Sequence, residues 1–252
     1  MKTQISDEEL AEQLVESFEI ARDFWRKNQG IVENFLNEFS EYFRAGFEES
    51  SRTLSPRIRE VVSTLAVHGW FVHDQLPFAE SAELADILKR GDSKTVDARL
   101  KKHFRMSLRT IKKSILTAYP ERKTILNQAF TAHTRKQYYL SVPVFLAQAD
   151  GICFELLGIP LFSKSKGKPR SARIVDQIDM PPLVTAFLEP LRMITPLSQD
   201  TDKIASSEKS YNRHAILHGL ANDYGNEINS FKSISLVLFL TQFEPDHGDA
   251  TT

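Results

Sequence analysis

Apolar side chains recur at intervals of three or four residues along most of this chain, a spacing that places them on one face of an α-helix. The clearest run covers six positions, namely Val96, Leu100, Phe104, Leu108, Ile111 and Ile115. Basic residues occupy many of the positions between them, so the sequence predicts a long helix with one apolar and one basic face. No alternating run is long enough to indicate a β-strand. The pattern therefore predicts an all-α fold, a multi-helix bundle.

Glycines, prolines and capping residues indicate where the expected helices begin and end. Ser6-x-x-Glu9 has the form of a capping box and opens a helical region in the first fifty residues. Further along, we expect helices over about residues 56–69, 82–90, 93–118, 120–136, 143–158, 183–191, 207–218 and 230–243. Pro56 and Pro143 are expected in the first turns of their helices, where the missing N–H costs little. Residues 163–173, SKSKGKPRSAR, are small and basic and contain Gly and Pro, which predicts a loop.

The formal net charge of the 252-residue chain is −1, but the charges are segregated along it. Residues 1–50 hold twelve acidic and five basic residues, a net charge of −7, whereas residues 98–136 hold eleven basic residues and one acidic residue, a net charge of +10. The small total therefore does not exclude a nucleic-acid partner. Phosphate contacts are expected from Lys101, Lys102, Arg105, Arg109, Lys112, Lys113, Arg122 and Lys123. The alternative is that these charges lie on solvated helix faces.

The remaining composition narrows the class of protein. The single cysteine, Cys153, excludes an internal disulfide framework and a zinc site built from cysteines, and it favours a reducing compartment. The first residues, MKTQISDEEL, lack the basic-then-apolar layout of a signal peptide. No apolar run approaches the roughly 20 residues of a membrane helix. We therefore expect a soluble, cytoplasmic protein with no membrane partner.

The segment 211–219, YNRHAILHG, concentrates the residues best suited to phosphate chemistry. Arg213 supplies a permanent planar cation that fits a phosphate, and His218 supplies an imidazole able to donate or accept a proton near neutral pH. Asn212 is a polar neighbour that could line the same site, and Gly219 stands where a glycine would end the helix. On an ideal helix Arg213 and His218 lie about 140° apart, so a site composed from two copies of the chain would bring them together more easily.

His214 and Asp150 leave alternatives open. His214 and His218 are four residues apart, which places them on one face, and such a pair can ligate a metal with Asp223 or Glu227 as the nearest further ligand. The alternative is that one of these histidines caps the end of the helix and the other is exposed. Asp150 stands inside the apolar segment LAQADGICFELL. We expect it either to be a hydrogen-bonded structural carboxylate or to orient Arg213.

Arg213, His214 and His218, in an Arg-polar-x3-His arrangement inside a C-terminal helical hairpin, resemble the signature of the HEPN superfamily. The resemblance implies an all-α bundle that forms a homodimer and brings two Arg/His pairs into one cleft. It implies a metal-independent endoribonuclease without a cofactor, with Arg213 and His218 catalytic and His214 at the polar second position. Many members act in toxin–antitoxin, abortive-infection and CRISPR-linked antiphage defence, which implies an antitoxin or defence-system partner protein. It also divides the chain into an N-terminal helical region, 1–140, and a HEPN-like helical domain, 141–252.

By this resemblance RNA would be cut through its own 2′-OH, while the basic residues of 98–136 and of the 164–173 segment hold the phosphate backbone. Two other functions stay open. A non-catalytic helical dimer that binds RNA or protein would use the Arg/His pair only to order the dimer, and the opposed charges of residues 1–50 and 98–136 favour it. A metal-dependent hydrolase would use His214 and His218 as ligands.

Overall fold

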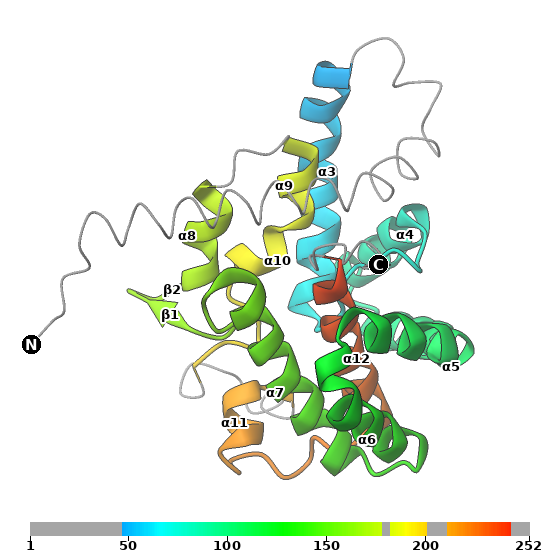
Figure 1. Cartoon of the computed structure of the whole chain (residues 1–252). Helices are drawn as coiled ribbons and strands as arrows, with labels where there is room; N and C mark the ends of the chain where they lie inside the picture. The colour runs from blue at the N-terminus through cyan, green and yellow to red at the C-terminus, as the bar shows by residue number, and fades with distance from the viewer. Residues whose placement is uncertain (1–46, 178–181, 201–210, 243–252) are drawn as a thin grey trace, which may run out of the picture.

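The computed structural model describes residues 47–177, 182–200 and 211–242, and these residues are helical nearly throughout (Figure 1). The helices are α3 (Phe47–Val67), α4 (Phe78–Lys89), α5 (Ser93–Ala118), the 3₁₀ turn η1 (Pro120–Arg122), α6 (Lys123–Thr134), α7 (Tyr138–Leu157), α8 (Arg170–Gln177), α9 (Pro182–Phe187), α10 (Glu189–Arg192), α11 (Arg213–Leu217) and α12 (Glu227–Thr241). The prediction of an all-α multi-helix fold is confirmed. The capping box at Ser6 and the rest of the helical region predicted in residues 1–46 lie outside the described residues.

Helix α5 begins and ends where the sequence predicts. The side chain of Asp92 accepts a hydrogen bond from the backbone N–H of Thr95 at 3.1 Å, which caps the first turn. Gly91, at φ 83°, ends the preceding helix, and Tyr119 follows the last turn of α5. The apolar face is buried through Val96, Leu100, Phe104, Ile111 and Ile115. The predicted division into an apolar and a basic face is therefore confirmed.

Two prolines expected in the first turns of helices lie inside them, so these two boundaries are wrong. Pro56 lies within α3, which begins at Phe47, and Pro143 lies within α7, which begins at Tyr138. A proline inside a helix removes one backbone hydrogen bond, but tertiary packing can hold the helix together. The neighbours Ser55 and Val142 are buried. Packing around each proline therefore supports a helix that local sequence signals would end.

The basic segment 163–173 is a hairpin and the start of a helix, which corrects the prediction of a loop. Strands β1 (Lys164–Ser165) and β2 (Lys168–Pro169) pair antiparallel, and α8 begins at the next residue. The two residues between the strands, Lys166 and Gly167, have φ values of 50° and 76°. Positive φ at both positions defines the type I′ turn, whose twist matches that of paired strands. A lysine at the first of these positions is unusual, and for that reason the turn is missed by sequence patterns.

Helix α12 forms the centre of the bundle and packs against both α5 and α7 (Figure 1). Its residues Phe231, Ile234 and Leu238 have no exposed side-chain surface. Helix α6 packs against α7, and α3 packs against α4 and α9. Core residues from both sides of residue 140 therefore meet in one hydrophobic cluster. Within the described residues, the two regions predicted from the sequence share this core.

Helix α7 is 20 residues long and by length and composition alone could cross a membrane. Here one of its faces packs into the bundle, where Phe145, Ala149 and Ile152 are fully buried. The exposed side of the same helix carries Leu140 and Phe154. The core helix of a globular protein can have the same length and hydropathy as a membrane-spanning helix, and the burial of one face of α7 is that of a core helix.

Candidate functional site

Asn212 fixes the start of α11 to the segment that precedes it. Its side-chain oxygen accepts a hydrogen bond from the backbone N–H of Ala215 at 2.9 Å, which makes it the N-cap. Its amide donates to the carbonyl oxygens of Pro196 and Gln199, each at 2.8 Å. Because Asn212 is fully buried, it supports the neighbouring residues from beneath and does not line a cleft.

Arg213 is held in place by Asp150 and Phe162. Its Nη2 donates to Oδ2 of Asp150 at 2.9 Å, and its guanidinium carbon lies 5.3 Å from the centre of the Phe162 ring. The other carboxylate oxygen of Asp150 accepts the backbone N–H of Phe162 at 3.2 Å. The two roles considered for Asp150 thus coincide, since the carboxylate is hydrogen-bonded on the inside of the fold and also orients Arg213.

The two histidines of the motif stack on one another at the end of α11. Their ring centres are 4.3 Å apart with the planes tilted by 45°. His218 is the C-cap and its backbone N–H donates to the carbonyl of His214 at 3.0 Å, while Gly219 follows at φ 69°. The predicted end of the helix at Gly219 is confirmed. Both histidines are exposed, so a ligand can approach them from solvent.

Arg213 and His214 open into the same surface pocket, which has a volume of about 350 Å³. The pocket is lined by Phe162, Lys164, Leu197, Ser198, Gln199, Asp200, Arg213 and His214. Lys164 forms an ion pair with Asp200 at its edge. His218 lies behind His214 and does not line the pocket. One copy of the chain therefore brings together Arg213, His214 and Asp150. His218 contacts this group only through the ring of His214.

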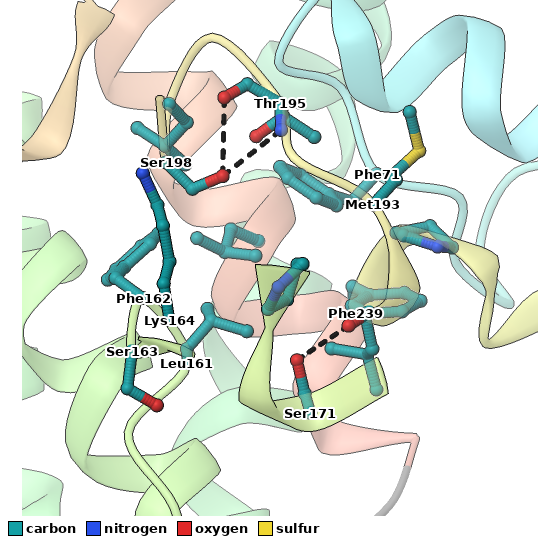
Figure 2. A pocket seen from close by; sticks show the side chains of 15 residues that line it. Phe71, Leu161, Phe162, Ser163, Lys164, Ser171, Met193, Thr195, Ser198 and Phe239 are labelled. Carbon is teal, nitrogen blue, oxygen red and sulfur yellow. Dashed lines mark hydrogen bonds between the residues drawn. The ribbon is translucent and has the colours of Figure 1, made fainter. Parts of the chain in front are cut away.

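A small cavity of about 30 Å³ adjoins this pocket and shares part of its wall, including Phe162, Lys164 and Ser198. Figure 2 shows these three side chains on the same side of the cavity. The Ser198 hydroxyl accepts the backbone N–H of Thr195 at 3.0 Å and donates to its carbonyl at 3.2 Å. The cavity has room for a water molecule but not for a nucleobase. It lies behind the wall that it shares with the pocket.

The eight basic residues expected to contact phosphate are spread over α5, η1 and α6, and two of them are already paired. Arg105 donates from Nε to Glu227 at 2.7 Å, and Arg122 pairs with Glu155 and donates to the Gln148 side chain at 2.7 Å. Lys112 Nζ lies 5.8 Å from the centre of the Phe130 ring, and Lys101 is half-buried. Four others are exposed and have no ion-pair partner among the described residues: Lys102, Arg109, Lys113 and Lys123.

The basic face of α5 and the Arg213 pocket lie on different sides of the bundle. Helix α12 packs between α5 and α7, and α11 contacts α7. Figure 1 shows α5 on the right of the molecule, with α11 and the β1–β2 hairpin on the left. The structure therefore does not place the predicted phosphate contacts of α5 next to the predicted catalytic residues.

Sequence patterns missed several residues of the pocket. Phe162, which stacks on Arg213, precedes the basic segment without any periodic signal, and Ser198, Gln199 and Asp200 belong to an irregular connection. Only their contact with α11 identifies them as part of the site.

A third ligand for the His214 and His218 pair is not found, since the described residues contain no group of three His, Cys, Asp or Glu side chains placed to hold a metal.

Burial sets the chemistry of two further groups near the site. Burial, together with the charge of Asp150, raises the pKa of the Cys153 thiol to about 12, so this cysteine stays protonated and unreactive. Burial also raises the pKa of the Tyr211 hydroxyl, which contacts the Ser233 hydroxyl at 3.3 Å. Neither group can act as a base near neutral pH.

Comparisons with protein-family models, with curated proteins and with solved structures find no match for this chain.

Proposed function

We propose that this protein is a metal-independent endoribonuclease of the HEPN type that works as a homodimer. The observation that carries the proposal is that Arg213 and His214 open into one surface pocket while His218 stacks on His214 at 4.3 Å. A permanent cation and an imidazole able to transfer a proton thus line the same pocket, and a second imidazole stacks on the first. RNA cleavage through the 2′-OH requires these two kinds of group.

In the proposed reaction, a histidine accepts the proton of the RNA 2′-OH, whose oxygen forms a bond to the adjacent phosphorus. The bond from phosphorus to the 5′-oxygen of the next nucleotide breaks, and that oxygen receives a proton from a second imidazole. The products are a 2′,3′-cyclic phosphate and a 5′-hydroxyl. Arg213 stabilises the negative charge that develops on the phosphorane oxygens, and Asp150 keeps its guanidinium in place.

A second copy of the chain would complete this site. In one copy His218 lies behind His214 and does not reach the pocket that Arg213 lines. Leu217 and Leu220, next to His218, are 37% and 64% exposed, and Tyr139 beside the same loop is 52% exposed. Exposed apolar side chains around a polar group are typical of an interface between subunits. A two-fold dimer through this surface would bring two Arg/His pairs together, as the resemblance implies.

A ribonuclease of this type is toxic to the cell that makes it unless it is restrained. The proposed biological role is therefore that of a toxin, abortive-infection or antiphage defence effector, held inactive by an antitoxin or another defence-system protein. The support for this role is the resemblance of the Arg213–His218 motif to the HEPN signature.

The test is incubation of the purified protein with total RNA in the presence of EDTA. We expect fragments with 2′,3′-cyclic phosphate ends, and we expect the variants His218→Ala and Arg213→Ala to lose this activity. His68→Ala is the matched control, because His68 directly follows α3 and does not line the pocket. EDTA-resistant cleavage that survives both the His218 and the Arg213 substitution would overturn the proposal, as would intact RNA with the wild-type protein.

A specific observation favours a second function, that of a non-catalytic binding dimer. The contacts of Arg213 with Asp150 and Phe162 tie α11 to α7 and would stabilise the fold even without a substrate. In that case RNA would stay intact, and Arg213→Ala would lower the melting temperature or change the oligomeric state. Measuring cleavage, melting temperature and mass in solution on the same variant separates the two functions.

A further inference from the structure

The β1–β2 hairpin and the start of α8 present a group of basic side chains that no described carboxylate neutralises. Lys166, Lys168, Arg170 and Arg173 are all exposed, and none of them forms an ion pair with a described residue. Nearby cations differ in this respect, since Lys164 pairs with Asp200 and Arg192 pairs with Asp176. Unpaired cations gathered on one short element are available for an anionic partner.

The turn holds these cations in a defined position. The register pairs Lys164 with Pro169 and Ser165 with Lys168, so Lys164 and Pro169 share the face that lines the small cavity. Lys168 therefore points from the opposite face, and Lys166 stands at the tip. Lys166 has φ 50°, a backbone conformation that Gly, Asn and Asp adopt more easily than other residues. The strain is tolerated at a position where the side chain is a cation pointing away from the bundle.

The hairpin continues directly from the wall of the Arg213 pocket. Phe162, which stacks on the Arg213 guanidinium, is followed by Ser163, whose carbonyl accepts the backbone N–H of Arg170 at 3.0 Å. Lys164 then lines the pocket itself. Figure 1 shows the hairpin projecting from the same side of the bundle as α11. The exposed hairpin cations therefore lead to the mouth of the pocket, where Lys164 is paired with Asp200 and Arg213 supplies the next cation.

We propose that the β1–β2 hairpin binds the phosphate backbone of single-stranded RNA and guides it into the Arg213 pocket, an inference that rests on the proposed ribonuclease function. A two-residue turn is narrow and offers a single line of cations, which fits one strand, whereas proteins that bind duplex RNA contact two grooves. The hairpin has no exposed large apolar side chain of the kind that inserts into a lipid surface. The basic face of α5, on the other side of the bundle, is then a separate surface.

The experiment measures binding of a single-stranded 2′-O-methyl RNA, which cannot be cut through a 2′-OH, over a range of salt concentrations. The variant Lys166→Gln/Lys168→Gln/Arg170→Gln removes three hairpin cations, and Lys102→Gln/Arg109→Gln/Lys113→Gln is the matched control on α5. The salt slope is the steepness with which log K falls as log salt concentration rises, and each lost phosphate contact on a single strand reduces it by about 0.7. The hairpin variant should therefore have a salt slope about 2 smaller than that of the wild type and bind about 100-fold more weakly at roughly 0.1 M salt. The α5 variant should keep the wild-type slope.

Lys166→Gly provides a second variant that keeps the turn, because glycine adopts positive φ without strain. It should lower the slope by about 0.7 and leave the melting temperature unchanged or higher. Unchanged slopes in both hairpin variants would overturn the inference, and so would an equal loss in the α5 variant or hairpin-dependent binding to anionic vesicles in place of RNA. Hairpin-dependent binding without cleavage of ordinary RNA would instead overturn the proposed chemistry and leave the hairpin as an RNA-binding element.

Discussion

The guanidinium of Arg213 donates to Asp150 at 2.9 Å and so joins α11 to the middle of α7 across 63 positions of sequence. The two side chains are 27% and 18% exposed, which places the pair at the inner edge of the pocket. Because Asp150 also accepts the backbone N–H of Phe162, one carboxylate connects α7, the segment before β1, and α11. The position of the candidate catalytic cation therefore depends on a residue outside its own motif.

Asp150→Ala is expected to lower both stability and RNA cleavage. Removing the carboxylate leaves the Phe162 N–H and the partly buried Arg213 without their partner, at a cost of about 1–3 kcal/mol in the free energy of unfolding. Urea titration measures this loss. Asp176→Ala is the control, since Asp176 also pairs with an arginine but is 53% exposed, where such a pair contributes about 0–1 kcal/mol. An equal, small loss in both variants would contradict the connecting role of Asp150.

Asp97 is expected to be a larger contributor, because the buried indole of Trp70 and the mostly buried ammonium of Lys232 both converge on it. The indole N–H of Trp70 donates to its Oδ1 at 2.8 Å, and Lys232 Nζ lies 3.4 Å from the same oxygen. Burial lowers the pKa of Lys232, and Asp97 opposes that change. Asp97→Ala would leave a buried ammonium and a buried N–H unpaired, a loss of about 3 kcal/mol. Asp97→Asn keeps an acceptor for Trp70 and should lose less, so equal losses in urea titration would show that the hydrogen bond to Trp70 contributes nothing and that the charge accounts for the loss.

Local signals predict much of this fold, and long-range contacts account for what they miss. The apolar face of α5 and the glycines that end helices, such as Gly91 and Gly219, follow from spacing and from the conformations that only glycine adopts easily. Pro56 and Pro143 lie inside helices, against the local signal, because tertiary packing outweighs the local cost of a proline.

The candidate site is predictable only in part, because long-range contacts bring several of its residues together. Arg213, His214 and the capping role of Gly219 lie within one short segment and can be recognised there. Phe162 and Asp200 reach the pocket only because the chain folds back onto α11, which no periodic pattern encodes. The hairpin depends on positive φ at Lys166, a residue type that rarely indicates a type I′ turn.

Stability is expected to fall in mildly acidic solution because of histidines inside the core. Burial lowers the pKa of His133 to about 4 and that of His73 to about 3, and at His133 the charge of Glu227 opposes this effect while that of Arg105 adds to it. In the unfolded chain both histidines titrate near 6.5, so the unfolded state binds more protons than the folded state below that pH. The stabilisation is complete above pH 6.5 and is lost progressively as the pH falls, down to about 4 for His133 and about 3 for His73.

The measurement is the free energy of unfolding of wild type and of His133→Gln between pH 8 and pH 4. His133 contributes roughly 3 kcal/mol to the pH dependence over this range, because a tenfold change in a proton-binding constant corresponds to about 1.4 kcal/mol. His133→Gln keeps a group that can hydrogen-bond to Ser230, which lies 2.8 Å from Nδ1 of the histidine, and it should flatten the profile by about that amount. A profile as steep as that of the wild type would assign the pH dependence to other groups.

Gly225 is expected to tolerate no side chain unless Tyr139 is also removed. A Cβ at this position would overlap the ring of Tyr139, whose hydroxyl donates to the carbonyl of Asn222 at 3.1 Å and whose ring packs edge-on against Tyr224. Gly225→Ala should therefore lower the free energy of unfolding by about 1–3 kcal/mol, because the whole ring must move and its contacts are lost.

A double-mutant cycle checks the cause of that loss. Tyr139 is 52% exposed, so Tyr139→Ala alone should cost little, and in its background Gly225→Ala should cost much less than in the wild type. Gly91→Ala serves as the control for backbone strain, since Gly91 has φ 83° and no described atom within 4 Å of a Cβ there. Its cost should not depend on Tyr139. If the two substitutions at 225 and 139 are additive, the packing of Tyr139 over this turn is not what requires glycine there.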